Sequence, residues 1–208
     1  EKLSEDTLKT LDEAVLKPSL LPASRQEALA RRFSALQRSD AGPVTVRLEF
    51  RSAGALGANA FALPSGIILV TDELIALAGD DEEILGVLAH ELGHVHARHG
   101  LRLMMEGSIV GLATAWYIGD VSTVLAGLPA ALSKARYSRA FETEADEFAA
   151  HMLRANGIAP ARLADILARM EASRARMHPD DGKSGNSPVD YFSSHPLSVE
   201  RIRRLRGG

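Results

Sequence analysis

The chain has 208 residues, of which 46% are hydrophobic and 25% are charged, and its formal net charge is −3. This composition is typical of a globular protein and excludes a disordered chain, while the charge gives no reason to expect nucleic-acid binding, which needs a clustered basic surface. Cysteine is absent. Disulfides, a thiol nucleophile and a cysteine-ligated zinc site are therefore excluded, and any metal must be held by histidine and carboxylate.

The first third of the chain predicts helices followed by a small sheet. Apolar residues recur at three- and four-residue intervals in two early segments, and further on they alternate with polar residues, as in a half-buried strand. Two apolar runs flank the turn signal Pro64-Ser65-Gly66 and suggest a hairpin or closely spaced strands. The predicted helices span 7–15, 24–37 and 72–77, and the predicted strands span 44–51, 59–63 and 67–70.

A long helix is predicted from Glu82 to about Met105, because Asp80 and Asp81 can cap its N-terminus and apolar residues follow at helical spacing. The next stretch, Gly107–Leu132, is almost entirely apolar or small. Glycines interrupt it and Asp120 lies near its middle, where a charge is costly in a bilayer. We expect a pair of short buried helices or a helical hairpin there. Contact of that hairpin with a bilayer or an unfolded substrate is the alternative.

The last third of the chain predicts further helices, over 137–153, over 160–177 and after His195-Pro196, with a flexible loop over 178–188. The basic stretch from Arg201 to Arg206 is interpreted as the solvated face of the terminal helix. The pattern predicts an α+β fold that is mostly helical, with a short sheet. We expect a single domain over 1–208, with N-terminal helices within 4–40 and a catalytic core over 44–206.

The sequence His90-Glu91-Leu92-Gly93-His94 is an HExxH motif within the long helix. Four residues advance a helix by about 400°, so His90 and His94 share one face and can bind one ion. Glu91 lies beside the pair, where its carboxylate can take a proton from water. A motif of five residues with only three fixed positions recurs by chance in many helices. A chance motif in this helix, however, would bury ionisable groups without partners.

A third ligand is expected, because a catalytic zinc usually has three protein ligands and one open position. Glu142 and Asp146 lie four residues apart on one face of a later predicted helix, while Glu144 points away from that face. They suit a ligand and a carboxylate that orients a ligating histidine. Such an acidic helix by itself is more often a solvated face, and the upstream motif favours the metal interpretation.

The HExxH motif, the segment from Glu142 to Asp146 with Ser138-Arg139 before it, and His195-Pro196 followed by Arg201-Ile202 together resemble one peptidase family. It is the family of the HtpX-type heat-shock proteases, the CAAX prenyl proteases, and the Oma-type and BepA-type proteases. The resemblance covers roughly residues 59–206. It implies a small zincin fold of the minigluzincin kind, in which the HExxH helix and the Glu-bearing helix pack together beneath the sheet.

The resemblance implies that one Zn²⁺ ion per chain is held by His90, His94 and Glu142. Glu91 would be the general base for hydrolysis of a peptide bond by metal-activated water, and Asp146 would orient a ligand. His195 matches a late histidine of the family, which stabilises the oxyanion or becomes a fourth ligand. A loop role for this histidine is the alternative.

The substrate is expected to be an unfolded or membrane-associated protein, and the process to be membrane-associated protein quality control. No nucleic-acid partner is expected. The resemblance implies a bacterial periplasmic or inner-membrane location, and membrane contact through an anchor preceding Glu1 or through 107–132. An extended peptide is predicted to pair with the strand formed by Asn59, Ala60, Phe61, Ala62 and Leu63, which is otherwise an ordinary core strand. Tyr137 and Arg139 can reach the cleft or serve packing and ion pairing.

The remaining histidines are interpreted as structural or solvated; they are His96, His99, His151 and His178. Two functions compete with a peptidase. One is a zinc-binding or chaperone-like module whose water position is blocked by a fourth ligand, and the preserved Glu91 argues against it. The other is a structural helical domain with an accidental motif, which metal analysis would reveal.

Overall fold

The computed structural model describes residues 2–37, 45–105, 137–177 and 191–207. The predictions for 107–132 and for the loop 178–188 lie outside the described residues. The described elements, in chain order, are α1 (Lys2–Ala14), β1 (Lys17–Pro18), α2 (Ala23–Gln37), β2 (Arg47–Ser52), the short 3-10 helix η1 (Gly54–Leu56), β3 (Ala60–Ala62), β4 (Ile67–Thr71), α3 (Asp72–Leu77), α4 (Asp81–His96), α7 (Arg139–Ala155), α8 (Ala161–Met177), α9 (Tyr191–Ser194) and α10 (Val199–Leu205).

The four strands form one sheet in the order β1-β2-β4-β3, in which β2 and β4 are parallel and the outer pairs are antiparallel. Successive side chains of a strand point to opposite faces. Ile68 and Val70 of β4 therefore join the main core, while Ile67 and Leu69 pack with Leu8 of α1. Both faces of β4 are covered, and for this reason all five of its residues are buried.

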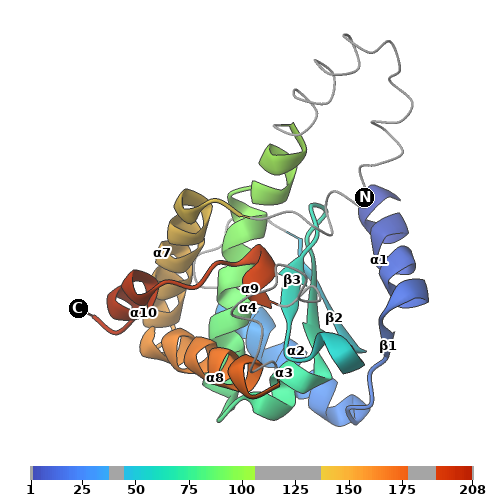
Figure 1. Ribbon diagram of the computed structural model, residues 1–208, viewed down its shortest axis with the longest axis horizontal. Helices are drawn as coiled ribbons and strands as arrows, with labels where there is room; N and C mark the ends of the chain where they lie inside the picture. Colours follow the sequence, from blue (N-terminus) through green and yellow to red (C-terminus); the bar gives the residue numbers. More distant parts are fainter. Residues whose placement is uncertain (1, 38–44, 106–136, 178–190, 208) are drawn as a thin grey trace.

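Helix α4 lies at the centre of the molecule, with the sheet on one side and α7 on the other (Figure 1). Helix α8 also packs on it. Two glycines allow these close approaches: a Cβ at Gly93 would lie 3.0 Å from Cα of Ala145 in α7, and a Cβ at Gly86 would lie 3.1 Å from Cα of Leu163 in α8. Small residues therefore bring α7 close to the face that carries the HExxH motif.

The predicted α+β class is confirmed, since helices surround a small sheet. The predicted long helix is wrong in its extent, because α4 ends at His96 and a turn at Ala97 and Arg98 precedes a further helical segment over 99–105. Arg98 has φ 55°, a left-handed conformation that terminates a helix. The Ala97 N–H bonds back to the carbonyls of Gly93 and Val95. The chain after Arg98 therefore takes a new direction.

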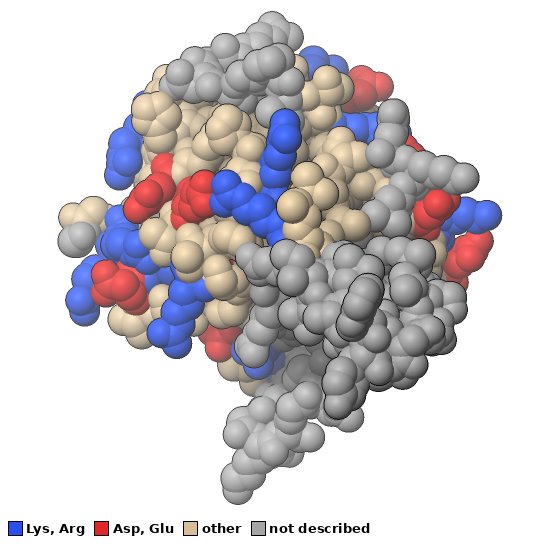
Figure 2. All heavy atoms as spheres, turned by 90° about the horizontal axis from the view of Figure 1, so that it is seen from above, with Lys and Arg blue, Asp and Glu red and all other residues tan. Residues whose placement is uncertain are grey.

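Acidic and basic side chains lie next to one another on the face shown in Figure 2, around a broad area of other residues. Charged side chains also pair between elements, such as Arg162 of α8 with Glu82 of α4, at 3.2 Å. Among the described helices, none combines the length and the apolar character that crossing a membrane requires.

Candidate active site

The two histidines of the HExxH motif face one another on α4, as the helical spacing predicts. His90 is 0% exposed and His94 is 1% exposed, and their Nε2 atoms are 3.0 Å apart. Two donors about 2.0–2.1 Å from one tetrahedral ion would lie roughly 3.3 Å apart. The spacing of the two nitrogens is thus close to that of a shared ion.

Glu142 enters this space from α7, near the N-terminal end of the helix, where Ser138 is the N-cap. Its Oε1 lies 3.3 Å from Nε2 of His94, and its Oε2 lies 3.7 Å from Nε2 of His90. Glu142 is 1% exposed. The carboxylate predicted as the third ligand therefore meets both imidazoles in a buried site.

His195 follows the short helix α9 and completes the cluster. Its Nδ1 lies 3.1 Å from Oε1 of Glu142 and 3.4 Å from Nε2 of His90. One donor atom from each of His90, His94, Glu142 and His195 lies within 4.8 Å of the others. Within the described part of the chain, these four buried residues form the one group with metal-binding geometry.

The hydrogen bonds around the cluster suit a metal ion. Nδ1 of His90 lies 3.0 Å from Oδ1 of Asp146, close enough for an ion pair though not aligned as a hydrogen bond, and this carboxylate favours the proton on Nδ1, so the lone pair of Nε2 faces the cluster. Among the described residues, Glu91 Oε2 and His195 Nε2 are buried and lack a hydrogen-bond partner. Buried polar atoms without partners are costly unless an ion or water satisfies them. The residues present fit one zinc ion.

Burial and charge act in opposite directions on the ionisation of these groups. Burial lowers the pKa of His94 well below its usual value, which favours the neutral imidazole that binds metals. Burial alone would raise the pKa of Glu142, but the charge on His195 and hydrogen bonds from His195 and His94 outweigh it, so the pKa is lowered. For His195, burial is outweighed by the charges of Glu91 and Glu142, which raise its pKa.

The interpretation of the stretch from Arg201 to Arg206 as a solvated face is wrong for Arg201. It is 3% exposed and lies against the cluster. Its guanidinium is 2.6 Å from Oε2 of Glu142 and donates to both carboxylate oxygens of Asp146, at 2.8 and 2.9 Å. Asp146 therefore links His90 to Arg201. Burial would raise the pKa of Asp146, but hydrogen bonds from His90 and Arg201 lower it.

Two tyrosines pack on the histidines of the cluster. The ring of Tyr137 stacks on His94, with centroids 4.0 Å apart, and the ring of Tyr191 stacks on His195, with centroids 4.4 Å apart. The Tyr191 hydroxyl donates to Oε1 of Glu91 at 3.3 Å. Sequence reasoning missed Tyr191, which belongs to no motif and follows the segment 178–188 in which a loop was predicted. Arg139 is exposed at the first residue of α7.

His99 was interpreted as structural or solvated, because on a continuous helix it would face away from the ligand pair. The structure places it 0% exposed, with Nδ1 2.9 Å from Nδ1 of His94. Its Nε2 lies 3.0 Å from Oε2 of Glu144. His96 and His151 are exposed, while His178 lies outside the described residues. Because α4 ends before Arg98, His99 lies against His94 instead of facing away from the ligand pair.

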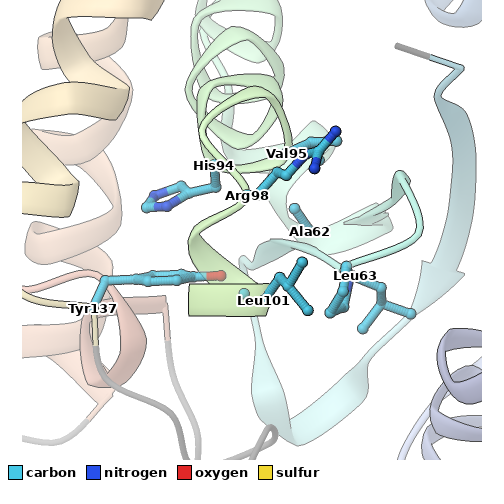
Figure 3. Close-up of a pocket in the computed structure, with 9 residues that line it drawn as sticks. Ala62, Leu63, His94, Val95, Arg98, Leu101 and Tyr137 are labelled. Atoms are coloured by element: carbon cyan, nitrogen blue, oxygen red, sulfur yellow. The ribbon is translucent and has the colours of Figure 1, made fainter. Parts of the chain in front are cut away.

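The predicted substrate strand is the edge of the sheet, since β3 pairs with β4 alone among the described strands. Three of its predicted contact residues, Asn59, Ala60 and Leu63, nevertheless have buried side chains. A small hollow lies between this edge and the end of α4 (Figure 3), with Ala62 and Leu63 on one side and His94 and Tyr137 on the other. Peptide binding at β3 would therefore depend on its backbone.

A buried His, His, Glu cluster with an adjacent Glu on an HExxH helix defines the zinc metallopeptidase class. The model of peptidase family M48 matches residues 23–208, and the chain belongs to this family. It is 32% identical over 158 residues to the metalloprotease LoiP of Escherichia coli, covering 71% of this chain and 57% of LoiP.

Two further relatives extend the similarity. The beta-barrel assembly-enhancing protease of Yersinia pestis is 26% identical over 163 residues, covering 71% of this chain and 32% of that protein. The mitochondrial metalloendopeptidase OMA1 of Saccharomyces cerevisiae is 27% identical over 154 residues, covering 71% of this chain and 42% of that protein. The matched region thus spans between about a third and somewhat more than half of each relative's length. The chain therefore belongs to a family whose relatives here are named as metalloproteases.

Proposed function

We propose that His90, His94 and Glu142 hold one zinc ion and that Glu91 is the general base of peptide-bond hydrolysis. The observation that carries this proposal is the convergence of three side chains from α4 and α7 on one buried point, with the Glu91 carboxylate beside it. When bound, zinc acts as a Lewis acid that acidifies water and polarises a carbonyl.

The residues around Glu91 support its role in proton transfer. Its Oε1 accepts a hydrogen bond from Tyr191 and lies 3.6 Å from Nε2 of His195, while its Oε2 has no partner among the described residues. A carboxylate with one oxygen held and the other free can take a proton from water and return it to the leaving amine.

His195 was expected either to stabilise the oxyanion or to bind the metal as a fourth ligand. The position of its Nδ1 among the donor atoms supports the fourth-ligand role in this conformation. Because a fourth ligand occupies the position of the attacking water, substrate turnover would then require His195 to withdraw. The raised pKa of His195 comes from neighbouring carboxylates, which would also favour an imidazolium facing a developing negative charge.

The substrate is proposed to be an unfolded or membrane-associated protein, cleaved in protein quality control at a membrane. Support comes from the names of relatives that act in β-barrel assembly and in mitochondria. It also comes from the open edge of β3, since pairing through backbone atoms tolerates varied side chains. A small hollow beside His94, lined by both apolar and polar side chains, lies next to this edge.

The substitution Glu91→Gln tests the catalytic proposal. The amide cannot accept the proton from water, so peptidase activity toward an unfolded protein should fall by at least about 100-fold, as for loss of a general base. Zinc content should stay at that of the unmodified chain, because Glu91 is not a proposed ligand. Activity that survives this substitution would contradict the role of Glu91. A chain that binds zinc but never cleaves would favour the binding-module alternative.

A further inference from the structure

One buried side chain in contact with a proposed ligand has no part in the mechanism above. His99 lies after the helix break at Arg98, and its Nδ1 is 2.9 Å from Nδ1 of His94. These are the nitrogens on the sides of the two rings away from Nε2. The contact therefore concerns how the His94 ring is oriented and which of its nitrogens carries the proton.

The contact between His94 and His99 fixes which of the two rings donates a proton and which accepts it. If Nε2 of His94 is to donate its lone pair to the ion, the proton of this ring must be on Nδ1. Nδ1 of His94 then donates to Nδ1 of His99, which accepts and so carries its own proton on Nε2. That Nε2 lies 3.0 Å from Oε2 of Glu144, an acceptor. Each atom in this chain has a partner of the complementary kind.

The surroundings hold His99 in place for this contact. Its ring stacks on Phe141 with centroids 4.2 Å apart and an interplanar angle of 14°. Arg102 pairs with the same oxygen of Glu144 at 3.3 Å, and its guanidinium lies over Phe141. The left-handed Arg98 places His99 here instead of on the opposite side of a continued helix. His90 has an equivalent partner in Asp146.

We propose that His99, held by Glu144, is a positioning residue for the metal site: it accepts the Nδ1 proton of His94 and fixes the tautomer and ring orientation that the ion requires. The inference rests on the proposed zinc coordination by His94. It assigns to each of the two histidine ligands its own partner, Asp146 for His90 and His99 for His94.

The test compares variants that keep the ring but remove the acceptor. His99→Phe preserves a stacked ring without nitrogen, and zinc affinity measured by competition with a chromophoric chelator should fall by about 10–100-fold, as is typical when a ligand loses its orienting partner. His99→Asn keeps an acceptor oxygen near the Nδ1 position and should bind zinc more like the unmodified chain than like His99→Phe. His96→Phe is the matched control, because His96 stacks on Phe148 without touching the cluster.

Cobalt substitution gives a second measurement that is independent of activity. The visible absorption of bound Co²⁺ reports ligand geometry, and it should change in His99→Phe and remain unchanged in His96→Phe. Equal zinc affinity and equal spectra in these two variants would overturn the proposal. If His99→Phe does not fold, Glu144→Ala carries the test, with exposed Glu147→Ala as its control: weaker zinc binding in Glu144→Ala alone supports the proposal, and equal binding overturns it.

The unmodified chain and His94→Ala separate this inference from the proposed function. Loss of zinc in His94→Ala with full affinity in His99→Phe would refute only the role of His99. Absence of zinc binding in the unmodified chain would refute the coordination itself, and the role of His99 with it.

Discussion

Single residues around the cluster show how far motif reasoning extends. The HExxH spacing and the Glu142–Asp146 pair predicted side chains that meet in the structure, because helix periodicity fixes which residues share a face. Arg201, His99 and Tyr191 were not predicted as part of this site. Each reaches it through tertiary structure, as the terminal helix, the segment after the helix break and α9 fold against α4 and α7. Periodicity carries no signal for such contacts, although Arg201 is one of the residues on which the family resemblance rests.

Arg201 is expected to be essential for stability. Its removal leaves the buried carboxylates of Glu142 and Asp146 without their cationic partner, and breaking a buried ion pair in this way costs about 3–5 kcal/mol. We predict that Arg201→Met lowers the free energy of unfolding by about this amount in urea denaturation. Arg203→Met, on the same helix and mostly exposed, should change it by less than about 0.5 kcal/mol. Similar midpoints for the two variants would contradict this account.

At the scale of elements, the helices and strands of the described residues were largely predicted from periodicity. The exceptions are short or depend on distant contacts. β1 has two residues and exists through its pairing with β2. α9 has four residues and packs Tyr191 against His195. The end of α4 at His96 was missed, because Arg98 is a residue type that rarely adopts a left-handed conformation and so gives no local stop signal.

The edge strand β3 leads to a prediction about substrate binding. Leu63 N donates to Ile67 O, and Thr71 N donates to Asn59 O, so by strand alternation the backbone groups of Ala60 and Ala62 point away from β4. Ala62→Pro removes an outward N–H without breaking a bond to β4. For an unfolded substrate, we expect KM to rise several-fold, with a smaller effect on kcat.

Ala62→Gly is the control for this prediction, because it keeps the N–H while it removes the methyl group. Its KM should stay near that of the unmodified chain. Should Ala62→Pro change only the thermal stability and leave KM unaltered, pairing of a peptide with β3 would be ruled out.

At the scale of the whole molecule, the cluster joins elements that are distant in sequence. His90 and His94 come from α4, Glu142 from α7, and His195 from the turn after α9. Such donors converge only in the folded chain, so the free energy of zinc binding adds to the stability of the fold. At a zinc concentration 100 times the dissociation constant, this contribution is about 2.7 kcal/mol. Treatment with EDTA should therefore lower the melting temperature by several degrees, and added zinc should restore it.

The zinc content of the purified chain and of Glu142→Ala, measured side by side after dialysis, tests the central claim most directly. The carboxylate of Glu142 lies 3.3 Å from Nε2 of His94 and 3.7 Å from Nε2 of His90, the two other proposed ligands. The account predicts one zinc ion per unmodified chain and substoichiometric zinc in folded Glu142→Ala. An unmodified chain without zinc, or a Glu142→Ala chain that retains one ion, would contradict the proposed coordination.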